Sequence, residues 1–367
     1  MEEMSTTTVV GLAGFLAGVI FGGVANKTNF CTMGAISDIV FMDDYGRFRS
    51  WLLAIAVAII GSQTLHVMGM VDLYESIYQT SNLGWLGGVI GGLIFGFGMT
   101  MTGGCANKNL VRIGGGNLKS IIVVVVMAIF AYMTLRGLIG LARVEIETFS
   151  NIDLTKIGLK SQGMIDIFAI LVGSEAENLR IGFSTAVVGC LLVYCFSDAR
   201  FRASPINIFG GITIGAMVPL GWWLTGVLGF DDFEPSALSS FTFVSPVGDS
   251  IQYLMTFTGA TINFGIATVG GVILGSFLVA IISGSFYIEA FNDKEDMKRH
   301  MLGAAIMGVG GVLALGCTVG QGITGMSTLA LGSVISLVSI IVGGLIGLKY
   351  LEEGTLGEAL KVLISRA

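Results

Sequence analysis

The chain has 367 residues, of which 53% are hydrophobic and only 12% are charged, and its net charge is −6. An average soluble domain carries about 25% charged residues, so this composition argues against a soluble globular protein. The sequence shows no basic patch of the kind that binds nucleic acid. Apolar stretches long enough to cross a lipid bilayer recur along the chain. We therefore expect an all-α polytopic membrane protein with a single transmembrane domain, 1–367.

The apolar runs predict roughly nine membrane-crossing helices, together with shorter broken or re-entrant helical pieces. The runs cover roughly 9–30, 51–71, 84–102, 119–140, 180–197, 206–228, 262–286, 301–316 and 327–348. The stretch 164–173 is too short to span, and we expect it at the membrane interface. The first run does not resemble a cleaved signal peptide, because no Lys or Arg precedes it. Its glycines at helical spacing predict close helix packing, and they are Gly11, Gly14, Gly18 and Gly22.

Lys and Arg residues in short loops predict the orientation in the membrane. Basic residues follow the first, third, fifth and seventh runs, and they include Arg47, Arg49, Lys108, Arg112, Lys119, Arg200, Arg202, Lys294, Lys298 and Arg299. The loops 72–82 and 229–249 contain no Lys or Arg. We therefore expect a periplasmic N-terminus and a cytoplasmic C-terminus. Segment 141–163 contains three basic residues and is the exception, because this scheme places it outside.

Three of the five cysteines stand where an apolar run gives way to a Gly-rich segment. Cys105 and Cys317 each have Gly at positions −1, −7 and −9, and Cys31 has Gly34 three residues later. Cysteines without a CxxC pair, together with only two histidines, predict neither a disulfide framework nor a metal site. We expect no cofactor. The remaining two, Cys190 and Cys195, lie within one apolar run and are expected to be packing residues.

The cysteine spacing predicts an internal repeat. The separation between Cys105 and Cys317 is nearly the same as the separation between Cys31 and Ser245. The copies cover roughly 11–140 and 206–350, and 141–205 connects them. The charge bias gives the copies opposite orientations, a plan common among secondary transporters, whose substrate sites lie at broken helices near the midplane. The repeat would then relate four positions, which are Cys31, Cys105, Cys317 and Ser245. The alternative is that Ser245 only begins a turn before Pro246.

A thiol beside a Gly-rich helix break suits a small anion. Such segments expose backbone N–H groups, and a short helix beginning after the break would add its positive end. A neutral thiol is a weak donor and a weak acceptor, which fits a sulfur-containing anion. The alternatives are that each cysteine is a small buried hydrophobe and that Lys108 and Arg112 only set the topology. The candidate substrate-binding residues are Cys31, Cys105, Cys317, Ser245, Gly104, Gly316, Lys108 and Gln321.

At these motifs the chain resembles the YeeE/YedE family of bacterial inner-membrane proteins. The matching stretches are Asn29–Ala35, Gly103–Cys105 running into Arg112–Gly114, and Gly316–Gly325. The resemblance implies uptake of thiosulfate into the cytoplasm, with the three motif cysteines binding the ion in turn along a narrow path. It also implies a small cytoplasmic sulfur carrier resembling TusA as a partner, although some relatives are linked to selenium metabolism. Lys108 and Asn109 stand where a glycine is expected in this family.

The sequence therefore favours a lipid-embedded carrier or channel-like conductor for thiosulfate or a related sulfur anion, and not an enzyme. We expect two cavities that meet at a narrow waist. The sequence shows no evident energy-coupling device, and a dianion that enters against a potential of about 100 mV costs about 4.6 kcal/mol. The rival is a membrane sulfurtransferase that carries sulfane sulfur as a cysteine persulfide, for which Lys108 is the only cation near Cys105. A purely structural subunit would leave the Gly/Cys frames unexplained.

Overall fold

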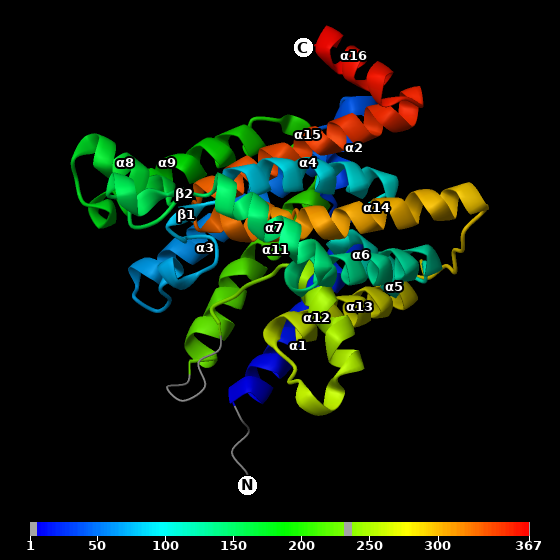
Figure 1. The fold of residues 1–367 in the computed structure, drawn as a ribbon, viewed down its shortest axis with the longest axis horizontal. Coiled ribbons are helices and arrows are strands. Elements are labelled where there is room, and N and C mark those ends of the chain that lie inside the picture. Colours follow the sequence, from blue (N-terminus) through cyan, green and yellow to red (C-terminus); the bar gives the residue numbers. More distant parts are fainter. Residues whose placement is uncertain (1–5, 231–236, 367) are drawn as a thin grey trace.

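The computed structural model describes residues 6–230 and 237–366 (Figure 1). In these ranges the protein is almost entirely helical, and two short strands pair antiparallel, β1 (Asn82–Leu83) with β2 (Ile152–Asp153). The α-helices are α1 (Thr6–Lys27), α2 (Thr32–Met42), α3 (Gly46–Val67), α4 (Trp85–Met101), α5 (Ala106–Gly114), α6 (Leu118–Arg136), α7 (Leu138–Ser150), α8 (Met164–Val172), α9 (Ala176–Phe196), α10 (Ala199–Arg202), α11 (Pro205–Trp223), α12 (Val244–Met255), α13 (Phe264–Ile282), α14 (Lys294–Leu313), α15 (Leu331–Glu353) and α16 (Leu356–Arg366). The shorter helical turns are η1 (Leu73–Glu75), η2 (Leu154–Ile157), η3 (Leu224–Leu228), η4 (Phe257–Gly259) and η5 (Gly320–Gly325). The predicted all-α membrane architecture is confirmed.

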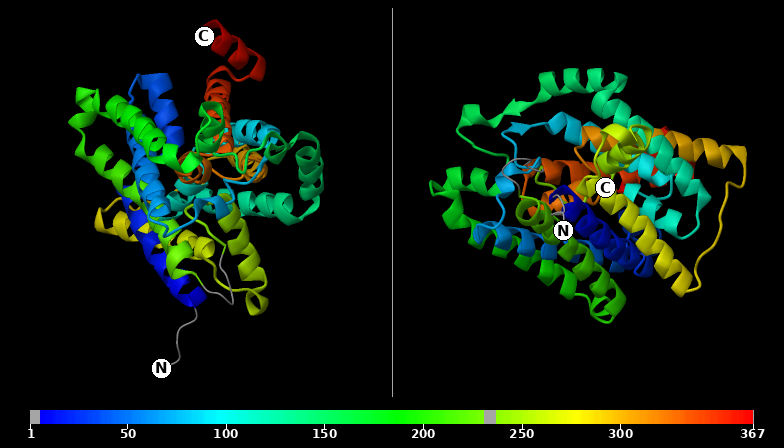
Figure 2. Two further views of the ribbon diagram at one scale, coloured as in Figure 1. Left: turned by 90° about the vertical axis from the view of Figure 1, so that its left-hand side faces the viewer. Right: turned by 90° about the horizontal axis from the view of Figure 1, so that it is seen from below.

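Eight helical stretches among the described residues are long and apolar enough to cross a membrane. They are Thr6–Met42, Gly46–Val67, Trp85–Gly114, Leu118–Arg136, Ala176–Phe196, Pro205–Leu228, Phe264–Ile282 and Leu331–Glu353. The predicted run 301–316 corresponds to α14, whose first turns are rich in charge, so the helix as a whole is less apolar than the others. Its apolar part packs between α4 and α6 in the bundle (Figures 1 and 2). The short apolar stretch forms α8, which packs on α9.

Three of the long helices are interrupted. The chain breaks between α1 and α2, between α4 and α5, and between α14 and the π-helical turn η5. Each break contains backbone in the left-handed region, at Asn29 (φ 52°), Gly103 (φ 69°) and Leu315 (φ 58°). Glycine adopts this region without strain, whereas Asn and Leu do so only where the surrounding structure holds them.

Two helix boundaries in the first half of the chain have counterparts at the same sequence separation in the second half. The first residues of α2 and α12, Thr32 and Val244, have the same separation in the sequence as the last residues of α4 and α14, Met101 and Leu313. The helices α3 and α13, and α6 and α15, follow in the same order. Cys105 and Cys317 have this separation too, so the cysteine spacing coincides with a spacing of whole helices.

Glycines allow long helices to pack closely together. Helices α1 and α13 approach so closely that a Cβ on Gly275 would overlap the Val19 carbonyl group, and one on Gly22 would overlap that of Val272. Gly14 and Gly18 face the same helix, as the spacing in the sequence predicted. Membrane helices have little hydrophobic drive to associate with one another, so close backbone contact between small residues stabilises their packing.

We expect Gly275→Ala to destabilise the protein by about 1–3 kcal/mol, because the added methyl group would force α1 away from α13. The measurement is thermal unfolding of the purified protein in detergent. Gly182→Ala on α9 is the matched control, since an added Cβ there would meet no atom within 4 Å. Equal melting temperatures for the two variants would contradict this account of the packing.

Candidate functional site

The three motif cysteines are buried, unpaired and close together. Cys31 precedes α2, Cys105 precedes α5, and Cys317 lies just before η5. The thiol of Cys105 is central, because the thiols of Cys31 and Cys317 are both close enough to interact with it electrostatically. Segments that are far apart in the sequence thus bring three sulfur atoms to one place inside the bundle.

Two of the sulfur atoms accept hydrogen bonds at the start of a helical segment. The Gly34 N–H donates to Cys31 Sγ at 3.3 Å, and the Gly320 N–H donates to Cys317 Sγ at 3.4 Å. In both cases the donor stands three residues after the cysteine, which is the geometry of an N-terminal helix cap. The exposed N–H groups of such a helix end favour negative charge. The expected short helix after the break is therefore present at both positions.

Cys105 has the same position at the start of α5. The backbone N–H of Lys108 and the side chain of Thr318 both face its sulfur. Asn109 closes the turn, because its amide donates to the carbonyl oxygens of Gly104 at 2.8 Å and Cys105 at 3.1 Å. All three thiols thus lie at the N-terminal end of a helical segment that starts inside the protein.

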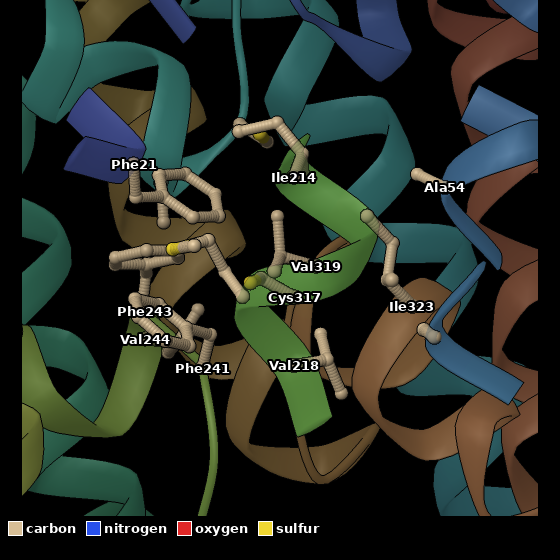
Figure 3. Close-up of a cluster of buried hydrophobic side chains, with 14 of the residues drawn as sticks. Phe21, Ala54, Ile214, Val218, Phe241, Phe243, Val244, Cys317, Val319 and Ile323 are labelled. Atoms are coloured by element: carbon tan, nitrogen blue, oxygen red, sulfur yellow. The ribbon is translucent and has the colours of Figure 1, made fainter. Parts of the chain in front are cut away.

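An aromatic cluster lines one side of the site. Figure 3 shows Cys317 beside Phe243 and Val244, with Phe241 and Phe21 completing the cluster. Phe21 stacks on Phe241 with ring centroids 5.2 Å apart and lies 5.3 Å from the ring of Phe243. The backbone N–H of Phe243 also faces the sulfur of Cys317. The side chains that form this wall are apolar and buried.

Two cavities approach the cysteines from opposite ends of α4. One reaches the Thr102 end and has a volume of about 630 Å³. Its lining is polar and comprises Asn26, Thr102, Lys108, Val111, Arg112, Gly115, Asn117, Lys119, Ser120, Ser285, Tyr287, Glu289, Asn292, Asp296, Arg299 and His300. We call it the inner cavity, because the charges of the loops predict that this end of the bundle faces the cytoplasm. The other reaches the Gly84 end, measures only about 20 Å³, and contains Tyr78, Gln162, Gln321, Ser333 and Ser336 in its wall. We call it the outer cavity, and its volume holds about one water molecule.

Tyr78 is a site residue that the sequence analysis missed. It is buried in the loop between α3 and α4, near Cys317, and its hydroxyl group bonds to Thr242. Burial raises the pKa of Tyr78 above its ordinary value, so the hydroxyl group stays neutral and can donate a hydrogen bond. The surrounding loop has neither helical nor alternating periodicity, so no pattern marked this residue.

The structure assigns other partners to two predicted site residues. Gln321 donates to the Ala314 carbonyl at 2.6 Å and accepts from the Ser333 hydroxyl at 2.7 Å, so both ends of its amide are used by the protein. It supports the turn that contains Gly316, whose φ of 157° requires glycine. Gly104 lies against the Lys108 side chain, where an added Cβ would stand 2.9 Å from Cγ.

Ser245 is the second residue of α12, and Phe243 occupies the position just before that helix. When the starts of α2 and α12 are aligned, Phe243 corresponds to Cys31, and Ser245 corresponds to Met33. Ser245 is half-buried, and its hydroxyl group forms no hydrogen bond within the described ranges. Its role in the site stays a prediction.

Comparison with known proteins identifies related sequences over nearly the whole chain. A family model described as "Sulphur transport" matches residues 27–346. The thiosulfate transporter TsuA of Escherichia coli (strain K12) is 26% identical over 325 residues, which cover 85% of this chain and 86% of that protein. The thiosulfate transporter TsuA of Spirochaeta thermophila is 23% identical over 332 residues, which cover 87% of this chain and 92% of that protein.

We expect Gln321→Ala to lower the free energy of unfolding by about 1–3 kcal/mol, because a buried carbonyl and a buried hydroxyl group would each lose a partner. Thermal unfolding in detergent checks this. Thr261→Ala, at an exposed position, is the control. An unchanged melting temperature for the Gln321 variant would show that the amide does not support the turn.

Proposed function

The chain belongs to the Sulphur transport (YeeE/YedE) family, and from this premise we propose that it takes up thiosulfate, or a closely related small sulfur anion, across the bacterial inner membrane. The observation that carries the proposal is the meeting of three buried thiols, each at the start of a helical segment, between two cavities. In this proposal the anion passes from the outer cavity, along the thiols, to the inner cavity.

Weak and numerous donors suit an ion that must bind and leave. A thiol donates weakly, and each helix start adds backbone N–H groups. Neutral thiols also avoid the repulsion that thiolates would exert on a dianion. Tyr78 would offer a hydroxyl group on the outer side of Cys317. The small outer cavity and the aromatic wall around Phe243 would make the passage narrow on this side.

The proposal includes an inverted repeat, with copies at roughly 11–140 and 206–350 joined by 141–205. Its support is the constant offset that the helix boundaries share with Cys105 and Cys317. We also propose a periplasmic N-terminus and a cytoplasmic C-terminus, from the distribution of Lys and Arg. A cytoplasmic sulfur carrier resembling TusA would consume the imported sulfur and so offset the cost of moving an anion against the membrane potential.

One observation favours the sulfurtransferase alternative. The side chain of Lys108 lies near the thiols of both Cys31 and Cys105. A thiolate stabilised there could attack the terminal sulfur of thiosulfate, so that an S–S bond forms on cysteine while the S–S bond of thiosulfate breaks and sulfite leaves. The test that follows separates this reaction from transport.

We expect uptake of ³⁵S-thiosulfate by cells that lack their own systems to distinguish Cys→Ser from Cys→Ala at positions 31, 105 and 317. A hydroxyl group can replace the thiol as a donor, so the Ser variants should keep part of the uptake, whereas the Ala variants should lose about tenfold or more. Cys190→Ala, at an exposed position on α9, should behave as the wild type. Sulfate, sulfite and selenite serve as competitors to define the substrate.

Persulfide chemistry predicts a different pattern. Serine cannot carry sulfane sulfur, so each Ser variant at a required position would be as inactive as the Ala variant. A persulfide on Cys105, detected by mass spectrometry after turnover, would favour the alternative over simple transport.

Ser245 is tested separately. In a Cys31→Ala background with residual uptake, we expect Ser245→Cys to remain active and to be blocked by a small membrane-impermeant thiol reagent added outside, with protection by excess thiosulfate. Thr261→Cys, at an exposed position before α13, is the control that should be labelled without loss of uptake. Full uptake after complete modification of the Ser245 variant would remove this residue from the pathway.

A further inference from the structure

Two cations in the wall of the inner cavity have no counter-ion. Lys108 bonds to the neutral side chain of Asn29, and Arg112 makes neither an ion pair nor a side-chain hydrogen bond within residues 6–230 and 237–366. Both side chains are half-buried. They stand four residues apart on α5, so they share one helix face and lie close to each other.

Other cations in the wall of the same cavity are neutralised. Lys119 contacts Glu289 and Asp296, each at 3.1 Å, and Arg299 contacts Asp296 at 2.7 Å. In this part of the wall, burial opposes ionisation of Asp296, but Lys119, His300 and Arg299 prevail and hold the pKa of its carboxyl group below the ordinary value. The unbalanced positive charge is therefore confined to Lys108 and Arg112.

The two cations also lie against the broken backbone before Cys105. A Cβ on Gly103 would stand 3.0 Å from an Arg112 guanidinium nitrogen, and the stem of Lys108 packs on Gly104. The ammonium group of Lys108 interacts electrostatically with the thiols of Cys31 and Cys105. A ligand held between these two side chains would thus adjoin the three-thiol site on its inner side.

Two like charges in a partly buried place repel each other, and no acidic side chain among the described residues compensates either of them. An anion of charge −2 would neutralise both, and oxygen atoms accept charge-assisted hydrogen bonds from both guanidinium and ammonium groups. We propose that Lys108 and Arg112 form a binding site for a small doubly charged oxyanion in the wall of the inner cavity. Its natural ligand, if the proposed function holds, is the transported anion on its way to the cytoplasm.

This site makes the two sides of the pathway unequal. The outer cavity is lined by neutral polar side chains, among them Tyr78 and Ser333, whereas the inner cavity presents two uncompensated cations. The inner position would therefore hold a dianion more strongly and would lower the energy of the ion at that point of the inward path, while the cost of the complete crossing stays the same. Charge alone does not distinguish sulfate from thiosulfate, so this site would bind both, and selection would fall to the thiols.

The test is equilibrium dialysis of the purified full-length protein with ³⁵S-sulfate as the probe. We expect one salt-sensitive site that Arg112→Gln and Lys108→Gln each weaken by about tenfold, while Arg112→Lys and Lys108→Arg keep most of the binding. Lys298→Gln is the matched control, because Lys298 is exposed and pairs with Glu295 outside this cavity lining. Gel filtration and melting temperature confirm that each variant is folded. Wild-type affinity in a folded Lys108→Gln/Arg112→Gln double variant would overturn the proposal.

Competition and uptake identify the ligand. Unlabelled thiosulfate should displace the probe, and Arg112→Gln should lower the maximal rate of thiosulfate uptake with little change in the external KM. Normal uptake in a variant that has lost sulfate binding would keep the site but assign it to a cytosolic anion such as phosphate or sulfate. A wild-type protein that binds sulfate but takes up no thiosulfate would refute the proposed function and leave this site standing.

Discussion

A helix that begins or ends inside a membrane leaves backbone N–H and C=O groups that lipid cannot satisfy. Three such breaks define this protein, and each is enclosed by the chain itself. At the break after α4, Thr102 donates to the Gly104 carbonyl at 2.9 Å and Asn109 donates to the same oxygen at 2.8 Å. At the break after α14, Gln321 performs the equivalent task for Ala314. In the proposed function, a passing anion would use the N–H groups that remain beside the sulfur atoms.

The close packing of helices through glycine holds these breaks in place. Close contacts such as that of Gly275 with α1 hold long helices at fixed distances, so that short helical segments can be presented in the interior with little freedom to move. A site made of weak donors depends on such rigidity, because each misplaced donor removes a large share of a small interaction. Polar side chains support the breaks, and small residues pack the helices. Both therefore hold the weak donors in fixed positions.

Much of this arrangement could be predicted from the sequence, because helix length and glycine frames are local properties and the cysteine spacing can be counted along the chain. The limits are equally physical. The sequence pairs Ser245 with Cys31 by counting residues, whereas an alignment of the starts of α2 and α12 pairs the apolar Phe243 with Cys31, and the role of Ser245 stays a prediction. Tyr78 comes from a loop without periodicity, and its approach to Cys317 depends on tertiary folding. The Gln321 side chain can donate and accept hydrogen bonds, as a ligand-binding residue must. Only the structure reveals that both ends of its amide are already bonded to the protein.

In the proposed inverted repeat Phe243 corresponds to Cys31, and this correspondence has a consequence for the direction of flow. Two perfectly matched halves would make a symmetric conductor, which works equally well whichever way it is inserted into a bilayer. In the proposed repeat, one of the four corresponding positions presents an aromatic ring, so the proposed path differs when it is followed from one face or from the other. We therefore expect rectification: molecules inserted in opposite senses into one vesicle membrane would pass the same ion, under the same gradient, at two different rates.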